Sequence, residues 1–199
     1  MSKVKLTKNE LRDQEHKLSQ LTKYLPTLQL KKGLLQQEVF KANAELKEKE
    51  GNFHKLREDL QSLNYLFAQT PGVDYKEVIK IEHLNKRYDN IAGVDVPTVE
   101  GIDFKKVDYS LFASPLWTDS LVNKLQKYVY AREEMHAARE KRDNLEKELR
   151  DVSIRVNLFE KIMIPRTQTA IKKIKVFLSD QQLMAVCQAK AAQKKVNCS

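Results

Sequence analysis

The residue types that most often carry chemistry are few in this chain and stand at unreactive spacings. The four histidines are scattered and show none of the spacings of a zinc site: His16, His54, His83 and His136. Cys187 and Cys198 form neither a disulfide framework nor a metal motif, and no Ser or Cys lies in a nucleophile motif. The sequence therefore predicts no metal site and no nucleophilic catalysis.

Phosphate binding and acid–base catalysis are equally unsupported. Gly33 lacks the second glycine and the following Ser or Thr of a phosphate-binding loop. The acidic pair Glu133-Glu134 lies in a mixed-charge helical stretch, where salt bridges to residues one turn away explain it. We expect a non-catalytic interaction protein with no bound cofactor.

The composition favours long helices surrounded by water. The 199 residues are 32% charged and 41% hydrophobic, with only 5 Gly and 5 Pro. There is no run of 18 apolar residues and no apolar segment of a signal peptide at the start. We therefore expect a cytoplasmic chain that is not inserted in a membrane.

An apolar heptad repeat runs through the N-terminal third. Thr7 and Glu10 have the spacing of a capping box, in which each side chain bonds the other residue's amide. The repeat that follows is interrupted only by Gln14, Lys32 and Lys49. Its a and d positions are Leu11, Gln14, Leu18, Leu21, Leu25, Leu28, Lys32, Leu35, Val39, Ala42, Leu46, Lys49, Phe53, Leu56, Leu60, Leu63 and Phe67.

A second apolar stripe occupies the C-terminal part, beginning near Thr118 and Asp119. Because a single helix cannot bury such a stripe, two stripes in one chain predict an antiparallel coiled-coil hairpin, with a parallel homodimer as the alternative. Facing residues should then have numbers that sum to about 186, and the last ~17 residues should overhang as a single helix. We expect helices over 1–67 and 118–199 and a β-containing insert over 68–117.

The insert carries helix-breaking and β-favouring residues. Thr70-Pro71-Gly72 is a turn signal, residues 78–84 alternate partly like a strand, and residues 91–96 form a second β-like run before Pro97. These features predict a small β-hairpin or β-patch where the coiled coil turns back.

Positive charge is concentrated at the two ends of the chain. Residues 1–32 hold 8 Lys/Arg and 3 Asp/Glu, and residues 161–199 hold 8 Lys/Arg and 1 Asp. In a hairpin these segments meet, so one tip is strongly basic. Such a tip suits an electrostatically matched cavity, but also a solvated end, a basic coiled coil that binds nucleic acid, or a tethering coiled coil.

Three stretches of the chain carry a family resemblance: residues 6–11 with 24–32, the segment Asn90–Pro97, and residues 156–166 with 171–174. They resemble the D subunit of the V-type (vacuolar/archaeal-type) rotary ATPase, in its bacterial branch. The segment Asn90–Pro97 reads NIAGVDVP and is similar to the family's N-V-A-G-V-x-x-P centre. Gln36-Gln37 departs from the lysines that many relatives carry there.

The resemblance implies a central rotor shaft that couples ATP hydrolysis or synthesis in the catalytic head to ion movement through the membrane ring. Its implied partners are the catalytic and non-catalytic head subunits, the small F subunit of the stalk, and a socket subunit on the membrane ring, with no nucleic acid. The chain would lie in the cytoplasm, peripheral to the membrane.

Three sets of residues are candidates for the contacts of such a shaft. The first is a head-contacting tip formed by Lys5, Lys8, Arg12, Arg166, Lys172, Lys173 and Lys175. The second is a base that contacts stalk partners, formed by Ile91, Val94, Tyr109, Phe112 and Trp117. The third is a pair of helix kinks at one level of the shaft, at Pro26 and Pro165.

Overall fold

The computed structural model describes residues 5–67, 77, 79–105, 115 and 117–196. The chain divides into two compact units. The terminal unit joins residues 1–32 to residues 151–199, and the central unit comprises residues 33–150. Both contain a segment of the N-terminal helix and a segment of the C-terminal half, and each is described by itself below.

The first long helix, α1, spans Lys8–Gln61 and begins at the predicted cap. The amide of Glu10 donates to Oγ1 of Thr7 at 3.3 Å, which satisfies one of the free amides of the first turn. The reciprocal half of the capping box is not formed, since Glu10 Oε1 accepts from Nε2 of Gln14 at 2.8 Å. A short helix, α2, follows at Asn64–Phe67.

The C-terminal half forms three consecutive helical segments. These are α4 (Thr118–Leu158), a π-helical turn η1 (Phe159–Met163) and α5 (Ile164–Val196). The helix begins next to Pro115, whose carbonyl accepts the amide of Thr118 at 3.0 Å. The sequence predicts one continuous stripe over this half with a kink at Pro165, and it does not predict the π turn that directly precedes this proline.

In the central unit, α1 and α4 bury their apolar stripes against each other. Leu46 packs with Met135 and Ala138, and Phe53 covers this cluster from one side. The ring of Phe53 also stacks on Tyr128 with centroids 5.0 Å apart. Leu35 and Leu145 are fully buried, so the a and d positions supply the core that the heptad repeat predicts.

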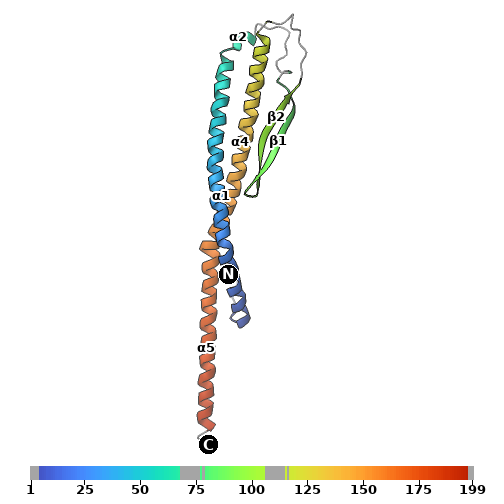
Figure 1. Cartoon of the computed structure of the whole chain (residues 1–199). Helices are drawn as coiled ribbons and strands as arrows, with labels where there is room; N and C mark the ends of the chain where they lie inside the picture. Colours follow the sequence, from blue (N-terminus) through green and yellow to red (C-terminus); the bar gives the residue numbers. More distant parts are fainter. Residues whose placement is uncertain (1–4, 68–76, 78, 106–114, 116, 197–199) are drawn as a thin grey trace. The chain divides into compact units, whose positions relative to one another are not determined.

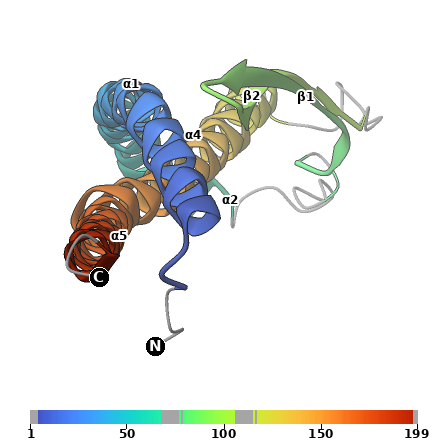
Figure 2. The ribbon, with the colours of Figure 1, turned by 90° about the horizontal axis from the view of Figure 1, so that it is seen from below.

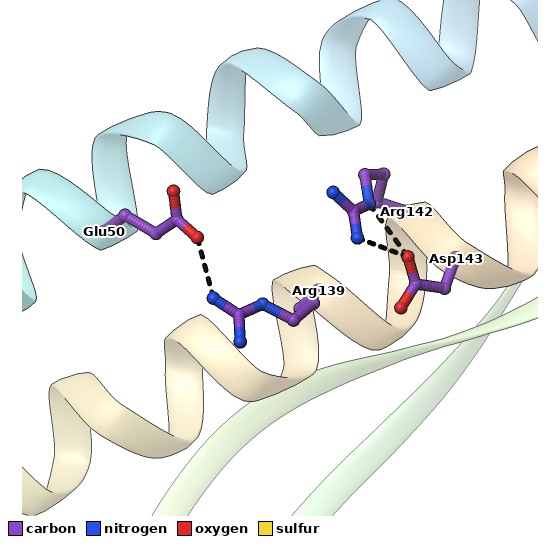
Figure 3. A network of polar contacts seen from close by, with 4 residues as sticks. All are labelled: Glu50, Arg139, Arg142 and Asp143. Carbon is purple, nitrogen blue, oxygen red and sulfur yellow. Dashed lines mark hydrogen bonds and ion pairs between the residues drawn. The ribbon is translucent and has the colours of Figure 1, made fainter.

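Ion pairs border this apolar seam and fix its direction. Lys49 contacts Glu134 at 2.7 Å, and Lys141 contacts Glu45 at 2.8 Å. A third pair, Arg139 with Glu50 at 2.8 Å, is drawn in Figure 3. The residue numbers of each pair sum to within about one helical turn of 186. The helices are therefore antiparallel partners within one chain, and the predicted fold class is confirmed.

A two-stranded antiparallel sheet completes the central unit. Strand β1 (Ile81–Ile91) pairs with β2 (Val94–Phe104) in consecutive order. The two-residue turn between them has positive φ at Ala92 (53°) and Gly93 (84°). Two positive φ angles match the turn types whose twist suits hairpin strands. The predicted β-hairpin is thus present.

One detail of the hairpin prediction is wrong. Residues 91–96, expected from the sequence to be a second strand ending at Pro97, include the turn, and Pro97 lies inside β2 opposite Tyr88. Proline is tolerated there because each strand of a two-stranded sheet has an unpaired edge, where no amide is needed.

Strand β2 anchors the hairpin to the helices. Val96 and Pro97 are almost fully buried, and residues 97–99 line a cavity of about 80 Å³ with side chains of α1 and α4. The ammonium of Lys86 also reaches Glu140 of α4 at 3.4 Å. The hairpin accordingly lies alongside α4 (Figures 1 and 2).

In the terminal unit, the start of α1 lies against α5. Lys175 pairs with Glu15 at 2.7 Å, and Ile174 is fully buried. The described side chains after Ser179 are all exposed, up to Gln193. Figure 1 shows α5 continuing beyond the first turn of α1, which is the overhang that the pairing sum predicts.

The burial contrast between two neighbouring leucines tests this packing. Leu35 is 0% exposed and Leu34 is 49% exposed on the same helix. Leu35→Ala should lower the free energy of unfolding by about 2–4 kcal/mol, because it leaves a cavity, and Leu34→Ala by less than about 1 kcal/mol. Urea titration followed by circular dichroism measures both values. Equal losses would contradict the packing described here.

The ion pair of Lys49 and Glu134 gives a pH prediction. The hydrogen bond to Glu134 outweighs desolvation and raises the pKa of Lys49 above 10.5. A lysine with a raised pKa adds stability below its unfolded pKa and loses it as the pH rises through the folded pKa. A double-mutant cycle with Lys49→Gln and Glu134→Gln should give a coupling of about 1 kcal/mol or less at pH 8.

That coupling should vanish once the pH exceeds the raised pKa of Lys49. The cycle cancels the titration of other groups, because each of them is present in all four proteins. A coupling that stays constant through this pH range would show that the pair is held by packing rather than by charge.

Candidate functional site

A basic groove in the terminal unit is the strongest candidate for a binding surface. Its volume is about 580 Å³. One wall comes from the first turns of α1 and the other from α5. The lining residues are Lys8, Asn9, Leu11, Arg12, Lys175, Leu178, Ser179 and Gln182. The antiparallel pairing of the two helices therefore brings together three of the seven predicted tip cations.

The remaining tip cations lie outside this groove. Lys5 precedes α1, and Arg166, Lys172 and Lys173 are exposed on α5. None of these four lines the groove. The structure thus divides the predicted tip into a three-cation groove and a set of dispersed, solvent-facing cations.

The groove carries positive charge, and its charged side chains are exposed to solvent and therefore screened by salt. The only carboxylate that pairs with a described groove cation is Glu15, and the side chains of Lys175 and Glu15 are 57% and 45% exposed. Ion pairs this exposed are screened by salt and contribute little to stability. Lys8 and Arg12 add two further exposed cations, so the groove suits an anionic partner surface.

The predicted base residues do not form one cluster in the described part of the chain. Ile91 and Val94 are half-buried at the two ends of the hairpin turn. Trp117 is half-buried at the start of α4, where its carbonyl accepts the amide of Leu121 at 3.1 Å. Tyr109 and Phe112 lie outside the described residues.

The two predicted kink sites have different surroundings. Pro26 lies inside the continuous helix α1, whereas Pro165 lies in the first turn of α5, directly after the π turn. If the pair Lys175–Glu15 sets the register of the terminal unit, Pro26 faces a residue close to 164. The proposed common level is consistent with this register but stays a prediction.

Sequence reasoning missed the residues that attach the hairpin. Val96 and Pro97 have the pattern of a strand end, yet they are the most buried part of β2. A signal was available in the alanines of α4, since Ala137 and Ala138 are buried and line the same cavity as Pro97. Small side chains on a helix leave room for a third element to pack.

The described part of the chain contains neither a metal-binding cluster nor a membrane-spanning helix. No group of three or more His, Cys, Asp or Glu side chains is placed to hold a metal ion among these residues. Across the same residues, no helix combines the length and the apolar content that crossing a bilayer would need.

Comparison with known proteins identifies the family. Residues 10–194 match the family model of the ATP synthase D subunit. The chain is 44% identical to the D subunit of the V-type ATP synthase of Chlamydia caviae, over 98% of this chain and 94% of that protein. The corresponding protein of Chlamydia trachomatis serovar L2 is 41% identical, over 98% of this chain and 97% of that protein.

This match covers both helices and the hairpin in one alignment. Residues 10–194 include the hairpin, α4 and all but the outermost residues of α1 and α5. The chain therefore belongs to the D-subunit family of V-type ATP synthases.

Proposed function

We propose that the chain is the central rotor-stalk subunit of a V-type rotary ATPase and couples ATP turnover in the catalytic head to ion movement through the membrane ring. The observation that carries this proposal is the near full-length match to the D-subunit family, joined to an antiparallel helix pair with an overhanging α5. The chain itself would be non-catalytic, working at the cytoplasmic side of the membrane as a peripheral part of the complex.

The helix pair has the mechanical properties that a shaft requires. A continuous α1 of 54 residues has a length of roughly 80 Å at 1.5 Å per residue. In the central unit, interlocked apolar side chains and three cross-helix ion pairs oppose sliding of one helix along the other. Torque applied to one helix would therefore pass to the other.

The terminal unit is proposed to contact the head subunits. Its basic groove and exposed cations would face carboxylates or carbonyl groups of the surrounding catalytic and non-catalytic subunits. Many weak, screened contacts suit a surface that must turn, because no single deep contact then has to break at each step.

The stalk partners are proposed to bind the base. The F subunit and the socket subunit on the membrane ring would contact the non-helical surface offered by the hairpin and the start of α4. Ile91, Val94 and Trp117 remain the described candidates, together with Tyr109 and Phe112 outside the described residues.

Reversing charge at the tip tests the head contact. Lys172→Glu, Lys173→Glu and Lys175→Glu together should at least halve the ATP-driven rotation rate of the reconstituted complex or block its assembly, since they replace attraction by repulsion. Single Lys→Ala changes should each have a small effect. A suitable control reverses three lysines of the central unit, Lys47, Lys55 and Lys147.

Both triple variants change the net charge equally, so only position distinguishes them. Full assembly and coupled turnover of the tip variant would show that these cations are a solvated end. Retention of the isolated chain on DNA, lost at high salt, together with failure to join the ATPase subunits, would instead favour a nucleic-acid-binding protein.

Truncation of Trp117 tests the base. Because aromatic side chains dominate many interfaces, Trp117→Ala should weaken binding to the isolated stalk partners about tenfold or more while leaving the helix content unchanged. Isothermal titration calorimetry and circular dichroism measure the two quantities. A loss of helix content instead would assign Trp117 to the local core, where its half-buried position also fits.

A further inference from the structure

The π turn of the terminal unit coincides with a change in the spacing of buried residues. Thr167 and Ile174 are both buried and lie seven residues apart, which is one heptad. Val152 and Thr167 are also buried, but fifteen residues separate them, which is two heptads and one residue. One residue too many has been inserted between two layers that must both face α1.

The π turn absorbs this additional residue. Fifteen residues of regular α-helix exceed four turns, which take about 14.4 residues, and would rotate the later layer away from its partner. Within η1 the amide of Ile164 bonds the carbonyl of Phe159, five residues back instead of four. A turn of this kind is a one-residue bulge that restores the phase of the buried face.

Pro165 lies where the lack of a backbone amide costs least, because the π turn has already shifted the hydrogen bonds of the preceding carbonyls. This residue cannot donate a hydrogen bond, and it lies in the first turn of α5 beside carbonyls whose bonding the π turn has already shifted. Two threonine hydroxyls donate to nearby carbonyls: Thr167 to Met163 and Thr169 to Pro165, each at 2.8 Å. The proline and the bulge thus act as one feature.

The facing stretch of α1, around Pro26, also lacks a backbone hydrogen bond and has few buried side chains. Pro26 cannot donate an amide to the carbonyl of Thr22, and the hydroxyls of Thr22 and Thr27 donate to carbonyls of the preceding turn. Leu25 and Leu28 are only half-buried, while Leu30 is 67% exposed. No residue of η1 is buried. The π turn η1 and the stretch of α1 around Pro26 therefore have both fewer backbone hydrogen bonds and less side-chain packing than a regular helix pair.

We propose that residues 159–165, with Pro26 on the facing helix, form a flexible joint at which the terminal unit bends and twists. The joint is a one-residue insertion in the helical repeat that joins α4 to α5. The suggestion that this joint yields under torque in a rotor rests on the proposed function. The joint itself does not depend on that function, because it is inferred only from the helix phase and the hydrogen bonds.

A deletion cycle on the full chain tests the insertion. Deleting Glu160 returns Val152 and Thr167 to a spacing of fourteen residues, but it places Pro165 inside a continuous helix, so the single deletion should lower the melting temperature. Deleting Glu160 in a Pro165→Ala background should raise it by about 5 °C above the wild-type value, because both defects are then gone.

The matched control deletes Asp143 in the same Pro165→Ala background. Asp143 is also acidic and exposed, and its ion pair with the adjacent Arg142 is a surface contact that contributes little to stability (Figure 3). It lies in regular α-helix between Ala138 and Leu145, which are seven residues apart. That deletion should lower the melting temperature, since it breaks the phase of two buried layers. If the Glu160 deletion with Pro165→Ala melts as low as this control, or fails to fold, the insertion proposal is wrong.

Flexibility itself is measured with spin labels on either side of the bulge. Labels at Arg155→Cys and Lys172→Cys, with Cys187 and Cys198 replaced by serine, report the distance distribution across residues 159–165. The distribution should narrow by about half when Glu160 is deleted with Pro165→Ala. An unchanged width would refute the joint even if the melting temperature rises. Assembly with the head subunits, measured separately, tests the rotor function and not this proposal.

Discussion

Each long helix of this protein carries an apolar stripe that only the other helix can cover, and the rest of the structure depends on that constraint. Leu35, Leu46 and Leu145 are buried only because α1 and α4 run antiparallel in one register. Antiparallel pairing also places Lys49 beside Glu134 in the central unit and Lys175 beside Glu15 in the terminal unit. The basic groove and the overhanging end of α5 are consequences of this pairing.

The fold was predictable from the sequence where a single periodicity decides the outcome. The heptads of α1 and the pairing sum near 186 give the helix partners, and the turn-forming residues Ala92 and Gly93 lie within the stretch expected to be non-helical. The continuation of β2 through Pro97 was missed because the proline rule assumes neighbouring strands on both edges, and this sheet has only the two strands β1 and β2. The π turn was missed because Val156, Met163, Ala170 and Phe177 keep a seven-residue spacing across it, which conceals the inserted residue in the sequence.

The candidate site was predictable only in part, for a physical reason. Charge counting places cations at both chain ends, but which of them converge depends on helix phase, and only Lys8, Arg12 and Lys175 line the groove. Contacts with partner subunits leave a weaker trace in sequence than a core does, since exposed side chains obey no strict period. Family membership, rather than any catalytic motif, therefore carries the functional conclusion.

We propose that this chain turns inside the catalytic head and passes torque along its paired helices. The most direct test attaches a bead to the chain in the reconstituted complex, with the head fixed to a surface, and follows the bead after ATP is added. We expect continuous rotation in one direction that stops when ATP is removed. A bead that shows only undirected fluctuation, in complexes that still hydrolyse ATP, would contradict it.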